Sequence, residues 1–460
     1  MGKVDVDGGL SGAIFCIIQI ESCGRRNNHY QNKGFRAVKK IIVLPFLILL
    51  LPIHIEESGR ADVGLTSIDT IEAPKQLQAL SDYIDIIRAH GENPDDQGVL
   101  IETLDRSQVL AEHNSNVTFN PASVMKLATS FVALARLGPD YRYRTNFFAD
   151  GSLDSSSRKL EGDLVVEGAA DPVFSLFDAQ EVASQLSRLG VSRVTGALRI
   201  AGPFYYFANG YHSNLSQETS AAKLRDALQR AGIRIEGGPA FGDKAGSILL
   251  SHYSDQLLSI LLFQNAHSSN AIAEVVGASL GGPQAIQEYL VKHLGISESE
   301  LFVGRASGLD FNRITPRATL KLLRALITEL ADHSLKPEDA MAVAGIDSGT
   351  LRNRLMRDDV RGSVIAKTGT LNSLDNGVST LVGIAYTKAH GPVLFAMFNS
   401  GGNVRAYRRL QDQFVEEIID ESGGALQVSR NADALADLTR HPIVQVLYGT
   451  GNQPVETATD

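Results

Sequence analysis

A serine and a lysine near position 123 have the types and spacing needed for acyl transfer. Ser123 opens an apolar run, and Lys126 follows it in an S-x-x-K pattern. Residues i and i+3 of a helix share a face, so the lysine amine can reach the serine hydroxyl. A desolvated lysine can take the hydroxyl proton, and backbone N–H groups at a helix start stabilise developing negative charge. We therefore interpret Ser123 as a nucleophile and Lys126 as its base.

The S-x-x-K pattern is weak evidence by itself, because it recurs at Ser156–Lys159 and Ser220–Lys223. Ser156 lies in a polar turn region. Ser220 opens an amphipathic helical pattern, but no further motifs follow it in a matching order. We interpret both as surface matches, in which a serine at a turn or helix start precedes an unrelated lysine.

Two later motifs follow Ser123 and support its assignment. Ser268-x-Asn270 lies in a long helical pattern, and the K-T-G motif at 367–369 lies in a strand pattern. S-x-x-K, S-D-N and K-T-G together are the motif set of penicillin-binding proteins and class A β-lactamases. A second S-x-N, at 429–431, follows K-T-G in a poorly patterned segment and is set aside.

Acyl transfer gives the polar residues of these motifs separate roles. Ser268 can relay a proton to the leaving amine, with Lys367 setting the local charge. Asn270 can hold a substrate amide. Whether Lys126 alone is the base for acylation is left open by the sequence.

The K-T-G strand is expected to bind the substrate at both ends of the reacting bond. Lys367 and Thr368 suit a substrate carboxylate. The backbone N–H groups of Ser123 and Thr370 would hold the oxyanion. Gly369 would let the substrate backbone approach the strand closely.

Hydrophobic periodicity predicts the elements that position these motifs. Helical patterns occupy 74–90, 123–138, 178–189, 220–231, 254–280, 282–294, 315–331 and 405–420. Strand patterns occupy 98–104, 109–111, 162–168, 191–201, 362–370, 378–387 and 392–399, with a polar turn region at 150–159. We predict an α/β (α+β) chain, in which helices cover an antiparallel sheet built from 63–149 and 250–421. A small α/β domain is inserted at 150–249, and 422–460 is a tail.

Residues 1–62 are predicted to be a leader. Basic residues at 36–40 precede an apolar run at 41–55, and small and polar residues follow, which is the order of a secretory signal peptide. The signal would lie near 36–61, and residues 1–35 would come from a start site placed upstream of a true start near Val38. An uncleaved anchor is the alternative, and it would imply peripheral association with a membrane. Either way, we expect an exported protein of the cell envelope.

Composition argues against several other classes of protein. The net charge is −9, and no long basic run occurs after the leader, so a nucleic-acid partner is not expected. Both cysteines, Cys16 and Cys23, lie in the leader, which excludes a disulfide framework in the rest of the chain. The 11 histidines show no H-E-x-x-H spacing, so we expect neither a metal nor a cofactor.

From about Gln76 to Asp420, the sequence resembles the D-alanyl-D-alanine carboxypeptidase/endopeptidase type of low-molecular-mass penicillin-binding protein (class C). The resemblance also covers G-D-L…G-A-A-D-P at 162–172, S-G-L…N-R at 307–313 and A-G-I-D…G-T-L…R at 344–354. It implies a transpeptidase/β-lactamase-like catalytic domain and a periplasmic serine enzyme that removes D-alanine from peptidoglycan stem peptides. It further implies cleavage of cross-links, and acylation by β-lactam antibiotics.

The same resemblance implies that Asp171, Arg354 and Asn372 contact the stem peptide, with a structural ion pair or turn as the alternative role. The sequence also departs from the family in one respect. Between Lys126 and Ser268 there is room for one of the two insertions that members often carry. This leaves the catalytic motifs intact but puts regulation, partner contacts and access for endopeptidase substrates in doubt.

Two other functions remain open at this point. A serine β-lactamase or esterase of the same fold shares the first and third motifs, but no glutamate has a persuasive context for activating the deacylating water. A catalytically silent cell-wall binding protein would not need the intact serine and lysine pairs.

Overall fold

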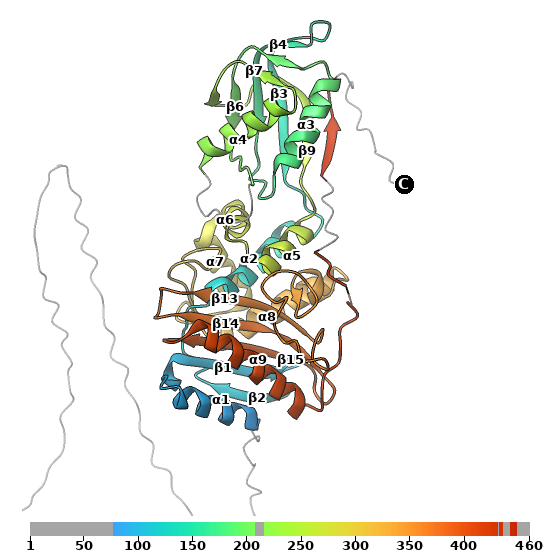
Figure 1. Cartoon of the computed structure of the whole chain (residues 1–460). Coiled ribbons are helices and arrows are strands. Elements are labelled where there is room, and N and C mark those ends of the chain that lie inside the picture. Colours follow the sequence, from blue (N-terminus) through green and yellow to red (C-terminus); the bar gives the residue numbers. More distant parts are fainter. Residues whose placement is uncertain (1–76, 208–215, 431, 436–441, 449–460) are drawn as a thin grey trace, which may run out of the picture. The chain divides into compact units, whose positions relative to one another are not determined.

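The computed structural model describes residues 77–207, 216–430, 432–435 and 442–448 (Figure 1). The predicted leader, with its signal peptide or anchor and both cysteines, lies outside these residues. Among the helices of the described ranges, none is long and apolar enough to cross a bilayer.

A six-stranded antiparallel sheet carries the late motifs, in the order β12-β13-β14-β15-β1-β2. Its strands are Gln97–Thr103 (β1), Val109–His113 (β2), Ala342–Val343 (β12), Val364–Leu371 (β13), Val378–Thr387 (β14) and Gly391–Ser400 (β15). β1 pairs with β15 along its whole length, so a strand from the start of the described chain completes a sheet formed mostly by its later part. The predicted antiparallel sheet is confirmed.

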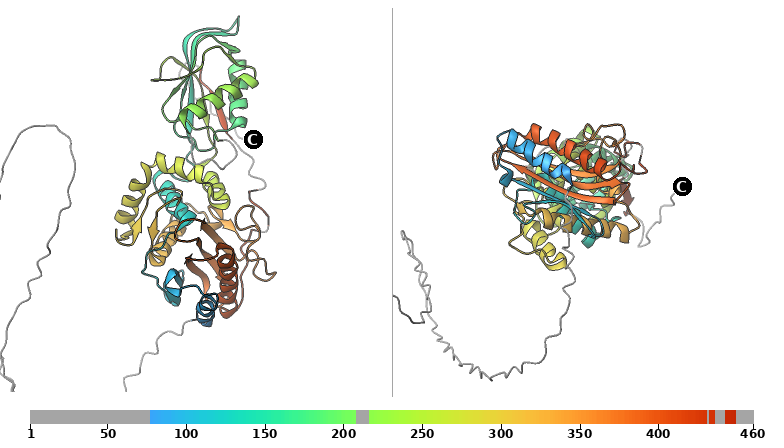
Figure 2. Two further views of the ribbon diagram at one scale, coloured as in Figure 1. Left: turned by 60° about the vertical axis from the view of Figure 1, so that its left-hand side comes forward. Right: turned by 90° about the horizontal axis from the view of Figure 1, so that it is seen from below.

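Helices cover both faces of this sheet, as the view from below in Figure 2 shows. On one face lie α1 (Gln78–Ala89) and α9 (Val404–Glu421). They meet through the rings of Tyr83 and Phe414, which stack at 4.7 Å. On the other face lie Lys126–Leu137 (α2), Leu257–His267 (α5), Asn270–Ser279 (α6), Gly282–Leu294 (α7) and Pro316–Asp332 (α8).

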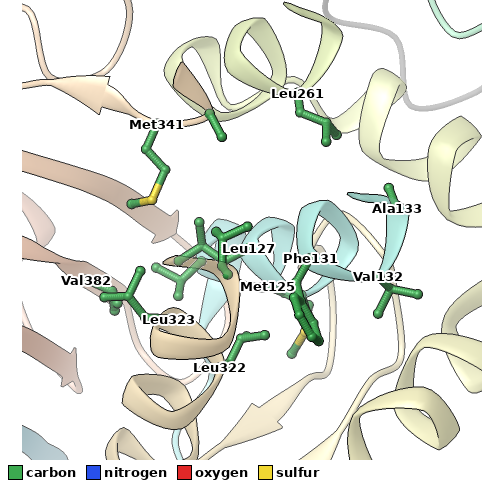
Figure 3. Close-up of a cluster of buried hydrophobic side chains, with 14 of the residues drawn as sticks. Met125, Leu127, Phe131, Val132, Ala133, Leu261, Leu322, Leu323, Met341 and Val382 are labelled. Atoms are coloured by element: carbon green, nitrogen blue, oxygen red, sulfur yellow. The ribbon is translucent and has the colours of Figure 1, made fainter. Parts of the chain in front are cut away.

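Helix α2 is the central helix of this second layer. Its residues from Lys126 to Leu134 are all buried. Side chains from α5, α8 and β14 surround it, among them Leu261, Leu323 and Val382 (Figure 3). Because these residues are closely packed, the polar groups of Lys126, Thr129 and Ser130 are strongly desolvated.

A second sheet has the order β16-β9-β3-β4-β5-β7, and β6 and β8 extend it beside β4. Its strands are Arg144–Asp154 (β3), Lys159–Glu167 (β4), Arg193–Val194 (β5), Leu198–Ala201 (β6), Arg234–Ile235 (β7), Pro239–Phe241 (β8), Ser247–Tyr253 (β9) and Ile443–Val446 (β16). Helices Leu176–Arg188 (α3) and Gln217–Arg230 (α4) pack on it with their own apolar core. This is the α/β unit expected at 150–249, with a sheet that extends beyond both predicted limits.

Short elements connect these layers. They are the two-stranded ribbon Leu301–Phe302 (β10) with Arg313–Ile314 (β11), and the 3₁₀ turns Pro94–Asp96 (η1), Ala122–Met125 (η2) and Pro337–Asp339 (η3).

Three predictions about local structure outside the candidate active site are wrong. The region 150–159 is mostly a hairpin, because β3 runs to Asp154 and β4 begins at Lys159. The strand expected at 191–201 is two short strands, β5 and β6. The segment 422–460 is not wholly a tail, since β16 pairs antiparallel with β9. In the hairpin, backbone pairing with a neighbouring strand satisfies a polar segment. In contrast, β16 is a short apolar run, I-V-Q-V, within the segment that was predicted to be a tail.

Candidate active site

Ser123 lies in the 3₁₀ turn η2, immediately before α2, rather than within an α-helix. The preceding residue, Ala122, has a φ of 47°, which non-glycine residues rarely adopt. Its N–H donates to Asn120 Oδ1 at 3.0 Å, which holds the turn in this conformation. The turn leaves Ser123 half-buried, whereas Lys126 in the next turn is fully buried.

The amine of Lys126 is surrounded by three oxygen atoms. Its Nζ lies 2.9 Å from Ser123 Oγ, 2.7 Å from Asn270 Oδ1 and 2.6 Å from the carbonyl oxygen of Ser307. Burial lowers the pKa of Lys126 to about 7, and the nearby carboxylate of Glu274 opposes this shift. A neutral amine has two N–H donors and one lone pair, so it can donate to Asn270 and Ser307 and accept the Ser123 proton.

Ser268 lies at a break between two helices. Its φ of 55° and ψ of 40° are left-handed and end α5, and the side chain of Ser269 then caps α6 by accepting from the N–H of Ile272 at 3.4 Å. The single helix predicted over 254–280 is therefore wrong. A left-handed non-glycine residue costs on the order of 1–3 kcal/mol, and such strain is often found at functional sites.

Ser268 pairs with a second buried amine. Lys367 Nζ donates to Ser268 Oγ at 2.9 Å and to the carbonyl of Thr368 at 2.6 Å. Burial lowers the pKa of Lys367 well below its ordinary value, and the neighbouring Lys126 lowers it further. The site thus contains two hydroxyl–amine pairs, each with a lysine that gives up its proton more readily than a lysine in water.

The edge of β13 beside these pairs is open. β12 pairs with β13 only at Ile365 and Ala366, and the N–H of Ala344 donates to the carbonyl of Val364 at 2.8 Å. Backbone groups of alternate residues point to the same side of a strand, so those of Thr368 and Thr370 face this edge. Within the described chain, no strand pairs with β13 there beyond Ala366. The N–H of Thr370 is therefore directed where a substrate strand would lie.

A cavity of about 320 Å³ brings the motifs together. Its lining residues are Ser123, Ser268, Asn270, Thr350, Arg354, Thr368, Thr370 and Arg408. Of the predicted site residues, Lys126 and Lys367 lie behind this lining, each hydrogen-bonded to a lining hydroxyl.

The cavity includes two residues that sequence reasoning missed. Thr350 Oγ1 accepts from Thr368 Oγ1 at 2.9 Å, and its place in the G-T-L segment was the available signal. Arg408 is exposed, and its Nη2 donates to Thr370 Oγ1 at 2.8 Å. It lies on α9, far from every motif, so no local pattern pointed to it. Arg354 lines the cavity as well, but its Nε lies 2.7 Å from both carboxylate oxygens of Asp412, which is the structural ion pair named as the alternative.

The reason predicted for Gly369 is wrong. A Cβ at this position would lie 2.0 Å from Thr380 Oγ1 and 2.5 Å from the carbonyl oxygen of Pro121. The missing side chain therefore faces the protein interior and lets β13 pack against the nucleophile turn. It does not make room for a substrate backbone.

Asp171 and Asn372 are not among the residues that line the cavity. Asp171 is buried, and its Oδ2 lies 3.8 Å from Nδ1 of His252 in the second sheet. Asn372 is exposed in the segment that follows β13. The structure therefore does not place either of them with the catalytic motifs.

The two rejected S-x-x-K matches do not form hydroxyl–amine pairs. Ser156 Oγ donates to Asp154, and Lys159 forms an ion pair with Glu161 at 2.5 Å. Ser220 is buried, not on the surface as predicted, and its hydroxyl accepts from the N–H of Tyr206 at 3.2 Å. Of the three matches, only the one at Ser123 brings its lysine amine into contact with its serine hydroxyl.

Residues 80–205 and 207–418 match the D-Ala-D-Ala carboxypeptidase 3 (S13) family. The chain belongs to this family. It is 27% identical over 221 residues to a D-alanyl-D-alanine carboxypeptidase of Actinomadura sp., which is 44% of this chain and 40% of that protein. The chain thus spans less than half the length of the curated relatives that it matches.

Several solved structures share the fold. A predatory peptidoglycan endopeptidase from Bdellovibrio bacteriovorus, also solved acylated by penicillin G, has a TM-score of 0.62 at 21% identity, covering 73% of this chain and 95% of that one. Penicillin-binding protein 4 from Haemophilus influenzae has a TM-score of 0.60 at 19% identity, covering 74% of this chain and 99% of that one. The penicillin-binding fold predicted from the sequence is confirmed.

Proposed function

We propose that this protein is a serine D-Ala-D-Ala carboxypeptidase, with D,D-endopeptidase activity on cross-linked stem peptides. The observation that carries the proposal is the distance of 2.9 Å between the buried amine of Lys126 and Ser123 Oγ. This pair lies beside the open edge of β13. Membership of the D-Ala-D-Ala carboxypeptidase family supplies the substrate class.

In the acylation step, Ser123 Oγ attacks the carbonyl carbon of the penultimate D-alanine, and Lys126 takes its proton. The N–H groups of Ser123 and Thr370 bind the oxyanion. Ser268 passes a proton to the leaving amine. The amine of Lys367, which lies behind Ser268, sets the local charge around this hydroxyl. The C–N bond then breaks, D-alanine departs, and the stem peptide remains as an ester on Ser123.

In the deacylation step, water attacks the ester carbonyl, and the freed peptide acid leaves with Ser123 restored. The cavity lining contains no aspartate or glutamate within the described ranges. A carboxylate that activates water against a penicilloyl ester is therefore missing from the lining. This favours the carboxypeptidase over the β-lactamase alternative.

Substrate binding follows from the charges around the cavity. Asn270 Oδ1 already accepts from Lys126, so its NH₂ group is left for a substrate carbonyl. Thr368 and Lys367, which lies behind the lining, suit the terminal carboxylate, and Arg408 contributes its guanidinium to the lining. We keep Arg354 as a residue that shapes this wall through its ion pair.

Several further expectations belong to this proposal. β-Lactams would acylate Ser123, as penicillin G does the Bdellovibrio endopeptidase. The protein would work in the periplasm or cell envelope, released or held at a membrane by its leader. The unit predicted at 150–249, together with the parts of β3 and β9 beyond these limits and with β16, would form a separate inserted domain within the catalytic domain predicted at 63–149 and 250–421.

The decisive test is incubation with a pentapeptide stem, with Ser123→Ala as the control. We expect the wild type to release free D-alanine and the variant to release none. No release, or equal release from both, overturns the assignment. Rapid turnover of a β-lactam would favour a β-lactamase, and folded protein that fails to label with fluorescent penicillin would favour a silent binding protein.

A further inference from the structure

The loop between Arg305 and Asn312 supplies one of the three oxygens around the general base. The carbonyl of Ser307 accepts from Lys126 Nζ at 2.6 Å. Glu274 on α6 holds the same residue, because its Oε1 accepts from Ser307 Oγ at 2.5 Å and from the Ser307 N–H at 3.1 Å. One carboxylate oxygen therefore fixes both the side chain and the backbone of the residue that binds the catalytic amine.

The other side of this loop is fixed by the nucleophile turn and α2. A Cβ on Gly308 would lie only 1.8 Å from the carbonyl oxygen of Ala122, so glycine allows the loop to press against the turn before Ser123. The hydroxyl of Thr129 on α2 donates to the carbonyl of Ala306 at 2.7 Å. The loop is therefore held between α6 and the turn that carries the nucleophile.

Glu274 does not line the cavity, so it is not placed to touch a substrate. Its carboxylate is partly buried and receives Arg305 Nε at 3.3 Å in addition to the two bonds from Ser307. Glu274 can therefore affect the reaction only through the position of the loop that it holds and through its own charge.

The orientation of Lys126 depends on where its two N–H donors go when the amine is neutral. With Asn270 Oδ1 and the Ser307 carbonyl both accepting, the lone pair is left for the hydroxyl of Ser123. Without a fixed Ser307 carbonyl, the amine can turn and donate to Ser123, which is the wrong direction for a base.

We propose that Glu274 is a positioning residue for acylation, which holds Ser307 so that the amine of Lys126 accepts the proton of Ser123. This inference rests on the proposed function and deepens it. Ser307 links Glu274 to Lys126. The contact with Arg305 keeps the carboxylate of Glu274 directed toward the loop.

The charge of Glu274 adds an effect that a purely structural contact would lack. It raises the pKa of Lys126 against the larger effect of burial. The other groups around the amine are the hydroxyl of Ser123, the amide of Asn270, the Ser307 carbonyl and the second amine, Lys367. Replacing Glu274 by a neutral group removes the negative charge, so Lys126 loses its proton at a lower pH.

The experiment measures the rate constant of acylation by fluorescent penicillin from pH 5 to 9. The variants are Glu274→Gln, Glu274→Ala and Ser307→Ala, and Glu288→Gln on the surface of α7 is the matched control. Glu274→Gln keeps an acceptor oxygen, so we expect its acidic limb to move to lower pH with a maximum rate within about threefold of wild type. Glu274→Ala loses the clamp, and we expect a fall of about 10–100-fold in the maximum rate.

Ser307→Ala should lower the rate in the same direction, and Glu274→Ala should then add little in the double variant, since the two residues act as one unit. An acidic limb of Glu274→Gln that coincides with that of Glu288→Gln overturns the inference. The inference is also overturned if the lower rate of Glu274→Ala is fully explained by a smaller amount of folded protein, as measured by thermal unfolding. A wild type that is not acylated and releases no D-alanine overturns the proposed function itself, whatever the Glu274 variants do.

Discussion

Replacing Lys126 by arginine tests the mechanism most directly, because the buried amine must be neutral to act as the base. The ordinary lysine pKa of 10.5 is lowered here to about 7 by burial. At pH 7, about half of such amines are neutral, against about one in 3,000 for a lysine in water. The fold thus raises the population of the base form by about a thousandfold. Arginine keeps the positive charge but stays protonated, since its own pKa exceeds about 12.

The expected magnitudes follow from these fractions. For wild type, the rate of acylation should fall below pH 7 by about tenfold for each pH unit, because only the deprotonated amine accepts the Ser123 proton. Lys126→Arg should lose about a thousandfold or more at pH 7. The direction is fixed by the base role: activity is lost as the pH falls, not as it rises.

The assay follows labelling by fluorescent penicillin over time from pH 5 to 9. Ser123→Ala sets the background, and thermal unfolding at each pH shows whether the protein remains folded. A wild-type rate that does not change between pH 5 and 8 would refute the reasoning. An arginine variant that is acylated at nearly the wild-type rate would do the same.

Three further predictions concern the relay, the packing under the site and the guanidinium of Arg408. Ser268→Ala removes the acceptor of the Lys367 amine and the relay to the leaving group, and should slow D-alanine release by about 10²–10⁴-fold, measured by an enzyme-coupled assay; a rate near wild type would contradict the relay. Gly369→Ala places a Cβ 2.0 Å from Thr380 Oγ1 and should destabilise the protein by about 1–3 kcal/mol in thermal unfolding. Gly238→Ala, with no atom within 4 Å of its Cβ, is the control, and equal melting temperatures would count against the packing argument. Arg408→Ala should weaken the binding of a stem peptide by about tenfold by isothermal titration calorimetry into the Ser123→Ala background, while Arg409→Ala on the same helix should not; equal affinities would remove Arg408 from the binding site.

The catalytic motifs were predictable because each is carried by a short local pattern. Ser123 and Lys126 are one turn apart, so any helical conformation brings them together. The strands at 362–370, 378–387 and 392–399 were found from their apolar runs, and the structure has β13, β14 and β15 at nearly the same positions. Their pairing into one antiparallel sheet follows from short connections.

Other features were missed because their causes are not local. The break at Ser268 is hidden inside a continuous helical pattern, since a left-handed serine leaves no mark in periodicity. β16 is an apolar run of only four residues, and its strand partner β9 lies far earlier in the sequence. Gly369 was assigned to the substrate, although Pro121 and Thr380, both distant in sequence, leave no room for a side chain there.

The sequence by itself determined which chemical groups are present and in what order, and these were enough to indicate a serine hydrolase of the penicillin-binding type that works through an acyl-enzyme. Only the tertiary structure decided the state of those groups. The pKa values of Lys126 and Lys367 are lowered because both amines are buried, and desolvation depends on every layer packed around them. The contacts of Arg408 with β13 and of Glu274 with the Ser307 loop likewise join segments that the sequence keeps apart. Such contacts arise from packing between elements, which local residue spacing does not record.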